Sequence, residues 1–141
     1  MDQTYTADQT ALVAKELLTE LVATDSATIV GLSGDLGAGK TTLVQAVARE
    51  LGVRDQVASP TFVIAKFYET ADDRFTHLVH IDAYRIEDIK ELMTLGWESI
   101  KEQPHTLVII EWPERIEELL GSTAVRFHID HQDSARHIKH V

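Results

Sequence analysis

Cysteine is absent from this chain of 141 residues. Its absence excludes disulfide bonds, thiolate nucleophiles and cysteine-ligated metal sites, and it is compatible with a reducing cytosol. No apolar run approaches the roughly 20 residues that a membrane-spanning helix needs. The first residues show neither the basic nor the apolar region of a secretory signal. We therefore expect a cytoplasmic protein that does not associate with membranes.

Basic residues are also scarce. The chain has 13 Lys and Arg against 23 Asp and Glu, which gives a formal net charge of −10. A protein that grips nucleic acid by itself usually carries a basic patch, because neutralising phosphates supplies most of the non-specific affinity. Any contact with RNA is therefore expected to pass through a protein partner. The acidic balance would equally suit a protein that is merely kept in solution by its charge.

What the sequence does contain is a glycine-rich loop. Residues 34–41 fit the phosphate-binding pattern G-x-x-x-x-G-K-[ST] without a mismatch. The glycines let the backbone turn tightly and bring its N–H groups close to phosphate oxygens. In such a loop the lysine pairs with the β- and γ-phosphates, and the hydroxyl can bind Mg²⁺. The candidate ATP-binding residues are Leu36, Gly37, Ala38, Gly39, Lys40, Thr41 and Thr42.

The flanks of the loop agree with this interpretation. Residues 27–32 are a short β-branched and apolar run, which predicts a buried strand. Apolar residues recur at helical spacing over 43–51, and Gly52 stands where a helix would end. A helix placed there points its N-terminal N–H groups at the phosphates. The chain contains no asparagine, so it lacks the Asn-Lys-x-Asp segment that reads guanine.

The remaining pattern predicts one α/β domain over residues 1–141, a P-loop NTPase with a mixed central sheet flanked by helices. Thr6 begins a capping box before a first helix, and a helical segment over 87–101 is interrupted near Gly96. A further helix runs from Pro113 to Gly121. The expected strands cover 3–6, 61–68, 75–83, 106–110, 123–131 and 135–141, and two pairs of them form hairpins.

Two acidic residues end apolar strands and compete for one role. Asp82 and Glu111 each follow such a run, and both arrive at the sheet's carboxyl edge if their strands flank the central one. A phosphate loop needs a nearby acid to hold Mg²⁺, and a second acid can orient the attacking water. Residue types alone do not say which acid does which. Either could instead cap a turn or pair with a base such as Arg85.

Three further features are weaker. The hydroxyl of Thr61, after Pro60, could lie near the γ-phosphate, or the segment could be a stiff turn entering a strand. Trp112 could pack on a nucleotide, form a partner surface or belong to the core. Of the seven histidines we place only His80 near the chemistry, and we expect the four on the terminal strands at the surface.

Four motifs taken together resemble the TsaE family, the small bacterial P-loop ATPases required to make threonylcarbamoyladenosine in tRNA. They are residues 34–42, Ser59-Pro60-Thr61-Phe62, His80-x-Asp82-x-Tyr84-Arg85 and Glu111-Trp112-Pro113-Glu114. This resemblance implies that Lys40 and Thr41 bind phosphate and Mg²⁺, and that Glu111 is the acid on the metal. It also implies that Asp82 is needed for hydrolysis. The catalytic set would then be Asp82, Lys40 and Glu111.

The resemblance also suggests further nucleotide contacts and the partners. Thr61 and Trp112 would lie near the nucleotide, Thr10 near the base, and Arg136 would match a family arginine. The family binds the TsaD–TsaB heterodimer and hydrolyses ATP so that the complex can cycle, while tRNA is reached only through that complex. We therefore expect a Mg²⁺-dependent ATPase. A small-molecule kinase with the same loop and a non-catalytic adaptor gated by nucleotide remain the alternatives.

Overall fold

The computed structural model describes residues 1–54 and 64–141. Within them, seven strands form one mixed sheet in the order β1-β7-β6-β2-β5-β4-β3. The strands are β1 (Asp2–Tyr5), β2 (Thr28–Ser33), β3 (Ala65–Glu69), β4 (His77–Asp82), β5 (Thr106–Glu111), β6 (Val125–Gln132) and β7 (Ala135–His140). The four central strands β6, β2, β5 and β4 run parallel, and the outer strands pair antiparallel. The predicted mixed sheet is confirmed.

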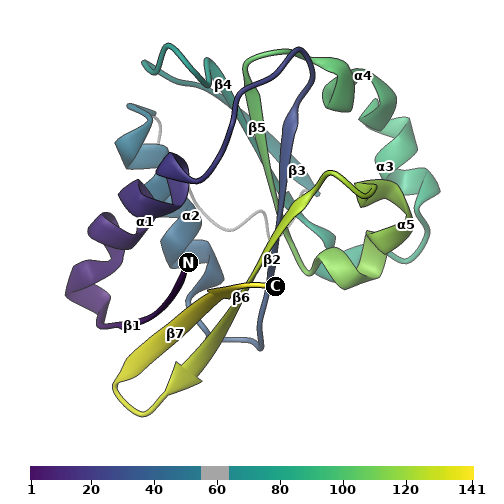
Figure 1. The fold of residues 1–141 in the computed structure, drawn as a ribbon. Coiled ribbons are helices and arrows are strands. Elements are labelled where there is room, and N and C mark those ends of the chain that lie inside the picture. Colours follow the sequence, from purple (N-terminus) through teal and green to yellow (C-terminus); the bar gives the residue numbers. More distant parts are fainter. Residues whose placement is uncertain (55–63) are drawn as a thin grey trace.

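Helices cover both faces of the sheet, as Figure 1 shows. They are α1 (Thr10–Thr19), α2 (Lys40–Glu50), α3 (Lys90–Thr94), α4 (Trp97–Glu102) and α5 (Glu117–Leu120). The first two pack on one face around a core that includes Leu17, Val44 and Phe127. The other three cover the opposite face, where Trp97 and Ile110 are fully buried. This layering places the sheet's middle strands between two apolar layers.

The position of strand β5 explains why its sequence is nearly all apolar. Every residue of Thr106–Glu111 is buried, because the strand lies between β2 and β4 and is covered on both faces. The sequence left open whether both acid-bearing strands flank the central strand β2, and in the structure only β5 does so. Strand β4 pairs with β5 and not with β2. The two acids still meet at one edge, since Asp82 lies opposite Glu111 in the β4–β5 ladder.

Most predicted boundaries agree with the structure to within a few residues. Gly96 separates α3 from α4 with a positive φ of 91°, and Gly52 follows α2 with a φ of 78°. The helix expected from Pro113 begins as a 3-10 turn and becomes α-helical only at Glu117. The predicted capping box at Thr6 also opens a 3-10 turn, after which α1 begins. The strand expected over 61–68 is described from Ala65 onward, where it pairs with β4 as the predicted hairpin.

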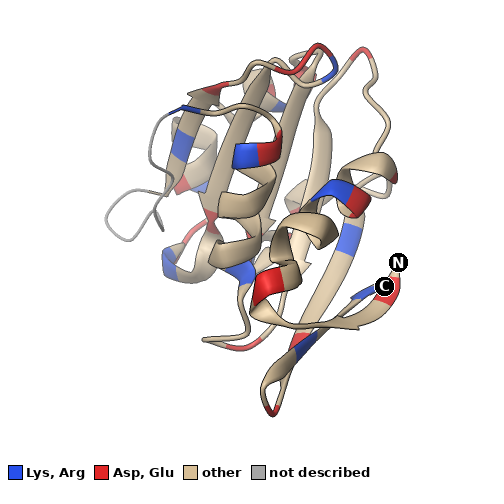
Figure 2. Ribbon diagram, turned by 90° about the vertical axis from the view of Figure 1, so that its left-hand side faces the viewer, with Lys and Arg blue, Asp and Glu red and all other residues tan. Residues whose placement is uncertain are grey.

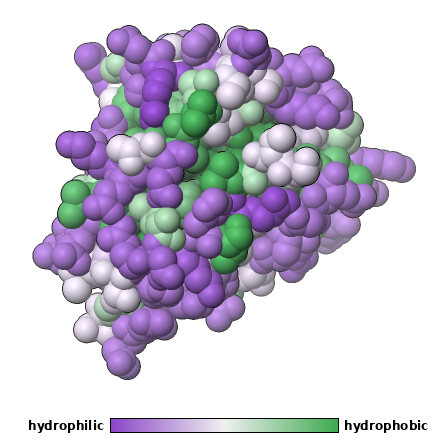
Figure 3. Space-filling view, viewed as in Figure 1, coloured by the Kyte–Doolittle hydropathy of each residue, from purple (hydrophilic) through white to green (hydrophobic). Residues whose placement is uncertain are grey.

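The surface is mostly polar. Figure 2 shows acidic and basic residues interspersed over the helices and loops of one side. On the face shown in Figure 3, hydrophobic residues gather in the gap between the two groups of helices, with hydrophilic residues around them. Among the described residues, none of the helices has the length and hydrophobicity required to cross a membrane.

Candidate active site at the phosphate-binding loop

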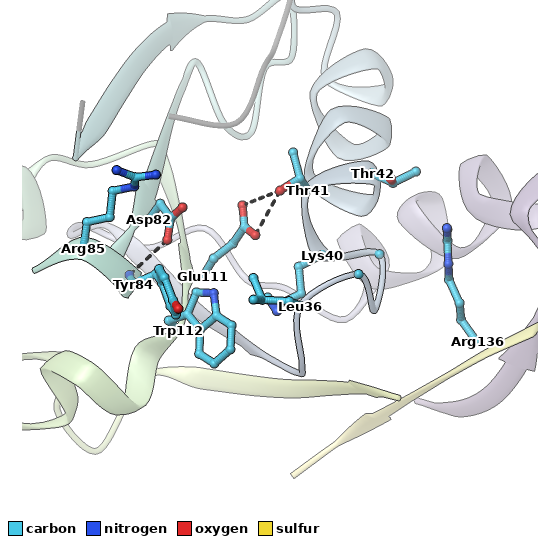
Figure 4. A pocket seen from close by; sticks show the side chains of 12 residues that line it. Leu36, Lys40, Thr41, Thr42, Asp82, Tyr84, Arg85, Glu111, Trp112 and Arg136 are labelled. Atoms are coloured by element: carbon cyan, nitrogen blue, oxygen red, sulfur yellow. Dashed lines mark hydrogen bonds between the residues drawn. The ribbon is translucent and has the colours of Figure 1, made fainter. Parts of the chain in front are cut away.

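The loop between β2 and α2 borders a pocket of about 360 Å³ at the carboxyl edge of the parallel strands. This is the edge where open α/β sheets bind their ligands. Figure 4 shows side chains from the loop, from the ends of β4 and β5 and from β7 around this pocket. The lining residues are Leu36, Gly37, Gly39, Lys40, Thr41, Thr42, Asp82, Tyr84, Arg85, Glu111, Trp112 and Arg136.

Two glycines of the loop have geometric reasons to be glycine. Gly34 has a φ of 145°, and a Cβ built there would lie 2.4 Å from the carbonyl oxygen of Ile129. Gly39, at the start of α2, has a φ of 105°, and its Cβ would lie 2.7 Å from Nε of Arg136. Both positions therefore combine a left-handed backbone with a close approach that only glycine permits. The backbone of the loop can consequently come close to a bound group.

Lys40 is held inside its own loop. Its side chain is buried, its ammonium donates to the carbonyl oxygens of Gly34 and Asp35, and Nζ lies 4.3 Å from the centre of the Trp112 ring. Burial lowers the pKa of Lys40, and the neighbouring carboxylates, Glu111 foremost, oppose this shift. The lysine is therefore a partly desolvated cation held against two backbone carbonyls of the loop.

Glu111 is the most constrained acid of the pocket. It is only 4% exposed. The hydroxyl of Thr41 lies 3.0 Å from Oε1 and 3.1 Å from Oε2, and Nε2 of His80 lies 2.5 Å from Oε2. A carboxylate at the end of β5 is thus tied to the first turn of α2 and to β4. The two ligand types that a phosphate loop offers to Mg²⁺, a hydroxyl and a strand-end carboxylate, are in direct contact.

Asp82 has a different environment, although it lies directly opposite Glu111 in the sheet. Its side chain is half-buried and accepts a hydrogen bond of 3.0 Å from the backbone N–H of Tyr84. It thereby caps the 3-10 turn that follows β4, which is one of the alternatives that the sequence left open. The alternative in which it pairs with Arg85 is not seen, since no ion pair joins these two described residues. One oxygen of Asp82 is therefore available to the pocket, as Figure 4 shows.

Aromatic rings connect the two strand ends. Trp112 and Tyr84 lie with their ring centres 5.0 Å apart, and Arg115 lies 5.3 Å from the centre of the Tyr84 ring. Trp112 has a left-handed backbone with a φ of 60°, which is rare for so large a side chain and marks a locally strained position. Strain of this kind is typically retained at functional sites. The tryptophan is partly buried: it lines the pocket and also packs against the hydrophobic cluster on the face covered by α3, α4 and α5.

Arg136 approaches the loop from the opposite side, as Figure 4 shows. It lies on β7 beside Tyr5 of β1 and packs against Gly39. Its Nη1 is buried without a hydrogen-bond partner among the described residues. Burial raises the pKa of Tyr5, and the positive charge of Arg136 opposes that shift. A guanidinium with an unused donor beside the loop is suited to an anionic group.

The structure brings together most of the predicted site residues, with three exceptions. Thr10 is buried, and its hydroxyl donates to the carbonyl of Ala7, so it does not line the pocket. Ala38 is buried within the loop and is not exposed to the pocket. Thr61 lies outside the described residues. The expectation for the terminal histidines agrees with the structure, where His128 and His137 are partly exposed and pair with Asp130 and Asp2.

Sequence reasoning did not include Tyr84 and Arg85 among the site residues, although both line the pocket. They follow Asp82 in a 3-10 turn, and this proximity was the signal that could have identified them. The sequence placed His80 near the site, and its Nε2 contacts the Glu111 carboxylate although the ring does not line the pocket.

The donor set fits a magnesium ion. The carboxylate of Glu111 and the hydroxyl of Thr41 are hard oxygen ligands of the kind Mg²⁺ prefers. In the part of the chain that the structure describes, no group of three His, Cys, Asp or Glu side chains could enclose a metal by itself. A site built from one carboxylate and one hydroxyl suits an ion whose other ligands are phosphate oxygens and water.

Comparisons with known proteins identify close relatives of the chain. The sequence model of the TsaE family, described as "Threonylcarbamoyl adenosine biosynthesis protein TsaE", matches residues 4–138. A protein named "tRNA threonylcarbamoyladenosine biosynthesis protein TsaE" from Streptomyces coelicolor is 40% identical over 117 residues, covering 80% of this chain and 76% of that protein. A protein of the same name from Haemophilus influenzae is 36% identical over 118 residues, covering 82% and 71%.

A solved structure agrees with these relatives. The crystal structure of Bacillus subtilis YdiB matches with a TM-score of 0.72 and 26% sequence identity, covering 99% of this chain and 83% of that one. The strand order and helix layers described above are therefore those of a known experimental fold.

Proposed function

Because this chain belongs to the TsaE family, we propose that it binds and hydrolyses ATP with Mg²⁺ in the biosynthesis of threonylcarbamoyladenosine in tRNA. The observation that carries the proposal is the contact between the Thr41 hydroxyl and the Glu111 carboxylate at the end of the phosphate loop. This pair gives the loop an oxygen-ligand site beside the position expected for the β- and γ-phosphates.

Each charged residue of the pocket has a distinct part in this proposal. The N–H groups of the loop and the ammonium of Lys40 bind the phosphate oxygens, and Arg136 offers a further donor on the other side of the loop. Thr41 and Glu111 would hold Mg²⁺. When bound, the ion neutralises charge that develops on the phosphate oxygens during transfer.

Asp82 is the residue assigned to the attacking water. Its free oxygen faces the pocket next to Glu111 and can accept a hydrogen bond from a water molecule. The water oxygen forms a bond to the γ-phosphorus while the bond to the β–γ bridging oxygen breaks, which gives ADP and phosphate. The proton of the water passes to Asp82 or leaves with the phosphate product. The rings of Tyr84 and Trp112 line this side of the pocket.

We further propose that the partner is the TsaD–TsaB heterodimer, with tRNA reached only through it, in the cytoplasm. The supporting observation is the net charge of −10, which disfavours direct binding to a polyanion. The relatives named above carry the name of the threonylcarbamoyladenosine pathway.

The test is phosphate release from ATP by the chain alone and mixed with TsaD and TsaB. We expect Mg²⁺-dependent release that Lys40→Ala reduces to background, because the variant loses the phosphate-binding cation. Lys15→Ala changes an exposed lysine on α1 and serves as the matched control with unchanged turnover.

Other results would contradict the proposal in distinct ways. Transfer of the γ-phosphate to a metabolite, without free phosphate, would indicate a kinase. Full function of the complex with a variant that binds ATP but cannot hydrolyse it would indicate an adaptor.

A further inference from the structure

His80 is a fully buried histidine that contacts the proposed metal ligand and does not line the pocket. Its exposed fraction is 0%, and Nε2 lies 2.5 Å from Oε2 of Glu111. On β4 it is two residues before Asp82, so the two side chains project from the same face of the sheet. From there the ring reaches diagonally to Glu111 on the neighbouring strand β5.

The direction of this hydrogen bond follows from the acceptor. An ionised carboxylate can only accept, so the ring must donate through Nε2. The other ring nitrogen, Nδ1, is buried and has no partner among the described residues. In the described part of the chain, the only hydrogen bond of the His80 ring is therefore the one to Glu111, and a side chain that served only in packing would not need it.

The contact restricts where the carboxylate can go. A glutamate side chain has three rotatable bonds, and fixing them costs conformational entropy. The donor from His80 holds Oε2 on one side, and the Thr41 hydroxyl touches both oxygens on the other. Carboxylates that bind metals are commonly oriented by such outer hydrogen bonds, and removing the outer partner weakens metal affinity.

We propose that His80 is a positioning residue, which orients the Glu111 carboxylate toward Thr41 and so pre-forms the site for Mg²⁺ on the bound triphosphate. This inference rests on the proposed function, because it assumes that Glu111 holds the metal. His80 itself touches neither the nucleotide nor the ion. Its contribution is the N–H donor at the position of Nε2.

The test compares variants that differ in that donor. His80→Gln places an amide nitrogen near the position of Nε2, whereas His80→Asn is one methylene shorter and His80→Met has no donor. Binding of a non-hydrolysable ATP analogue is measured by calorimetry, in EDTA and over a Mg²⁺ series. Mg²⁺ should increase the affinity for the analogue, and the measured quantity is the Mg²⁺ concentration that gives half of this increase. We expect that concentration to rise about 10- to 100-fold in His80→Met and His80→Asn, and to rise much less in His80→Gln.

Binding in EDTA separates positioning from a general structural role. We expect the metal-free affinity to change less than about threefold in all variants, because the loop and Lys40 do not depend on His80. His77→Met alters an exposed histidine on the same strand and should leave both affinities unchanged. If His80→Met fails to fold, the Gln and Asn pair decides.

Three results would overturn the inference. One is a wild-type Mg²⁺ response in His80→Asn or His80→Met, and another is an equal loss in His80→Gln and His80→Asn. The third is a loss of the same size in EDTA and in Mg²⁺, which would indicate only structural damage. If the wild-type chain bound the analogue without any Mg²⁺ effect, the proposed function would fail first, and the role of His80 would fail with it.

Discussion

The ends of strands β4 and β5 look alike in sequence and differ in surroundings. Each strand is an apolar run that finishes in an acid, and Asp82 and Glu111 lie opposite each other in the ladder. Glu111 is 4% exposed and contacts the side chains of Thr41 and His80. Asp82 is half-buried, and among the described residues its side chain bonds only to the backbone of its own turn. The same local pattern thus produces one rigid acid and one accessible acid.

The difference shows that the role of a strand-end acid is set by the elements packed around it. Glu111 lies beside β2, so the helix that follows the phosphate loop brings Thr41 to it. Asp82 is one strand further out, and its hydrogen bond in the described part of the chain is to the backbone of Tyr84 and not to a side chain of the loop. An acid fixed against the loop suits a metal ligand, and an acid with a free oxygen suits the orientation of water.

The largest effect is expected from neutralising the rigid acid. Glu111→Gln keeps the size of the side chain but loses the charge that would bind Mg²⁺. We expect ATP turnover to fall about 10³-fold, since a bound metal supplies several kcal/mol of transition-state stabilisation. Phosphate release under saturating Mg²⁺ measures it. Turnover within tenfold of the wild type would mean that Glu111 is not the acid that holds the metal, and the distinction between the two acids would be wrong.

Neutralising the accessible acid should have a smaller and more selective effect. For Asp82→Asn we expect a loss of about 10²-fold in turnover, within the usual range for proton transfer by a positioned side chain. Affinity for the Mg²⁺–nucleotide complex should stay within about threefold. Single-turnover hydrolysis and equilibrium binding on the same preparation separate the two quantities. A parallel loss of binding would mean that Asp82 also holds the ion.

Arg85, which follows Asp82 at the end of β4, tests whether this end of the sheet acts in the hydrolysis step or only in nucleotide binding. It is exposed, lines the pocket and forms no ion pair with the described residues, so its charge is available to a phosphate. We expect Arg85→Ala to lower turnover about tenfold, with nucleotide binding changed less, because cations near transferring phosphates act mainly in the transition state. Arg49→Ala, at the far end of α2, is the control. A loss confined to nucleotide affinity would argue for simple ground-state binding.

The smallest effect concerns the aromatic contact that joins the two strand ends. Trp112 follows Glu111, Tyr84 follows Asp82 by two residues, and their rings lie 5.0 Å apart. We expect a double-mutant cycle of Trp112→Leu and Tyr84→Leu to give a coupling of about 1 kcal/mol in the free energy of unfolding. Urea denaturation measures it. Additive effects would mean that the two ends are energetically independent.

The sequence predicted the parts of the site that depend on local pattern. The phosphate loop, its strand and its helix follow from contiguous residues, and the positions of Lys40 and Thr41 follow with them. The acids at the ends of β4 and β5 could also be predicted from local sequence. The distinction between the acids came only from the family resemblance, because in physical terms it depends on contacts with His80 and Thr41 from other elements.

Two other features depended on long-range structure. The β6–β7 hairpin was predicted from local pattern, but its position beside β2, which brings Arg136 to Gly39, depends on the strand order of the whole sheet. The strand order places β4 beyond β5, so only one of the two acid-bearing strands flanks β2, a point that the sequence left open. The assignment of Thr10 to the base remains a prediction, and its hydroxyl is engaged by the carbonyl of Ala7.

The most direct test of the different roles of the two acids is calorimetric binding of a non-hydrolysable ATP analogue with and without Mg²⁺. The wild type, Glu111→Gln and Asp82→Asn are compared in parallel. We expect Mg²⁺ to tighten binding at least about tenfold in the wild type and in Asp82→Asn, and to have no such effect in Glu111→Gln. Tightening that survives in Glu111→Gln, or that disappears in Asp82→Asn, would contradict the account.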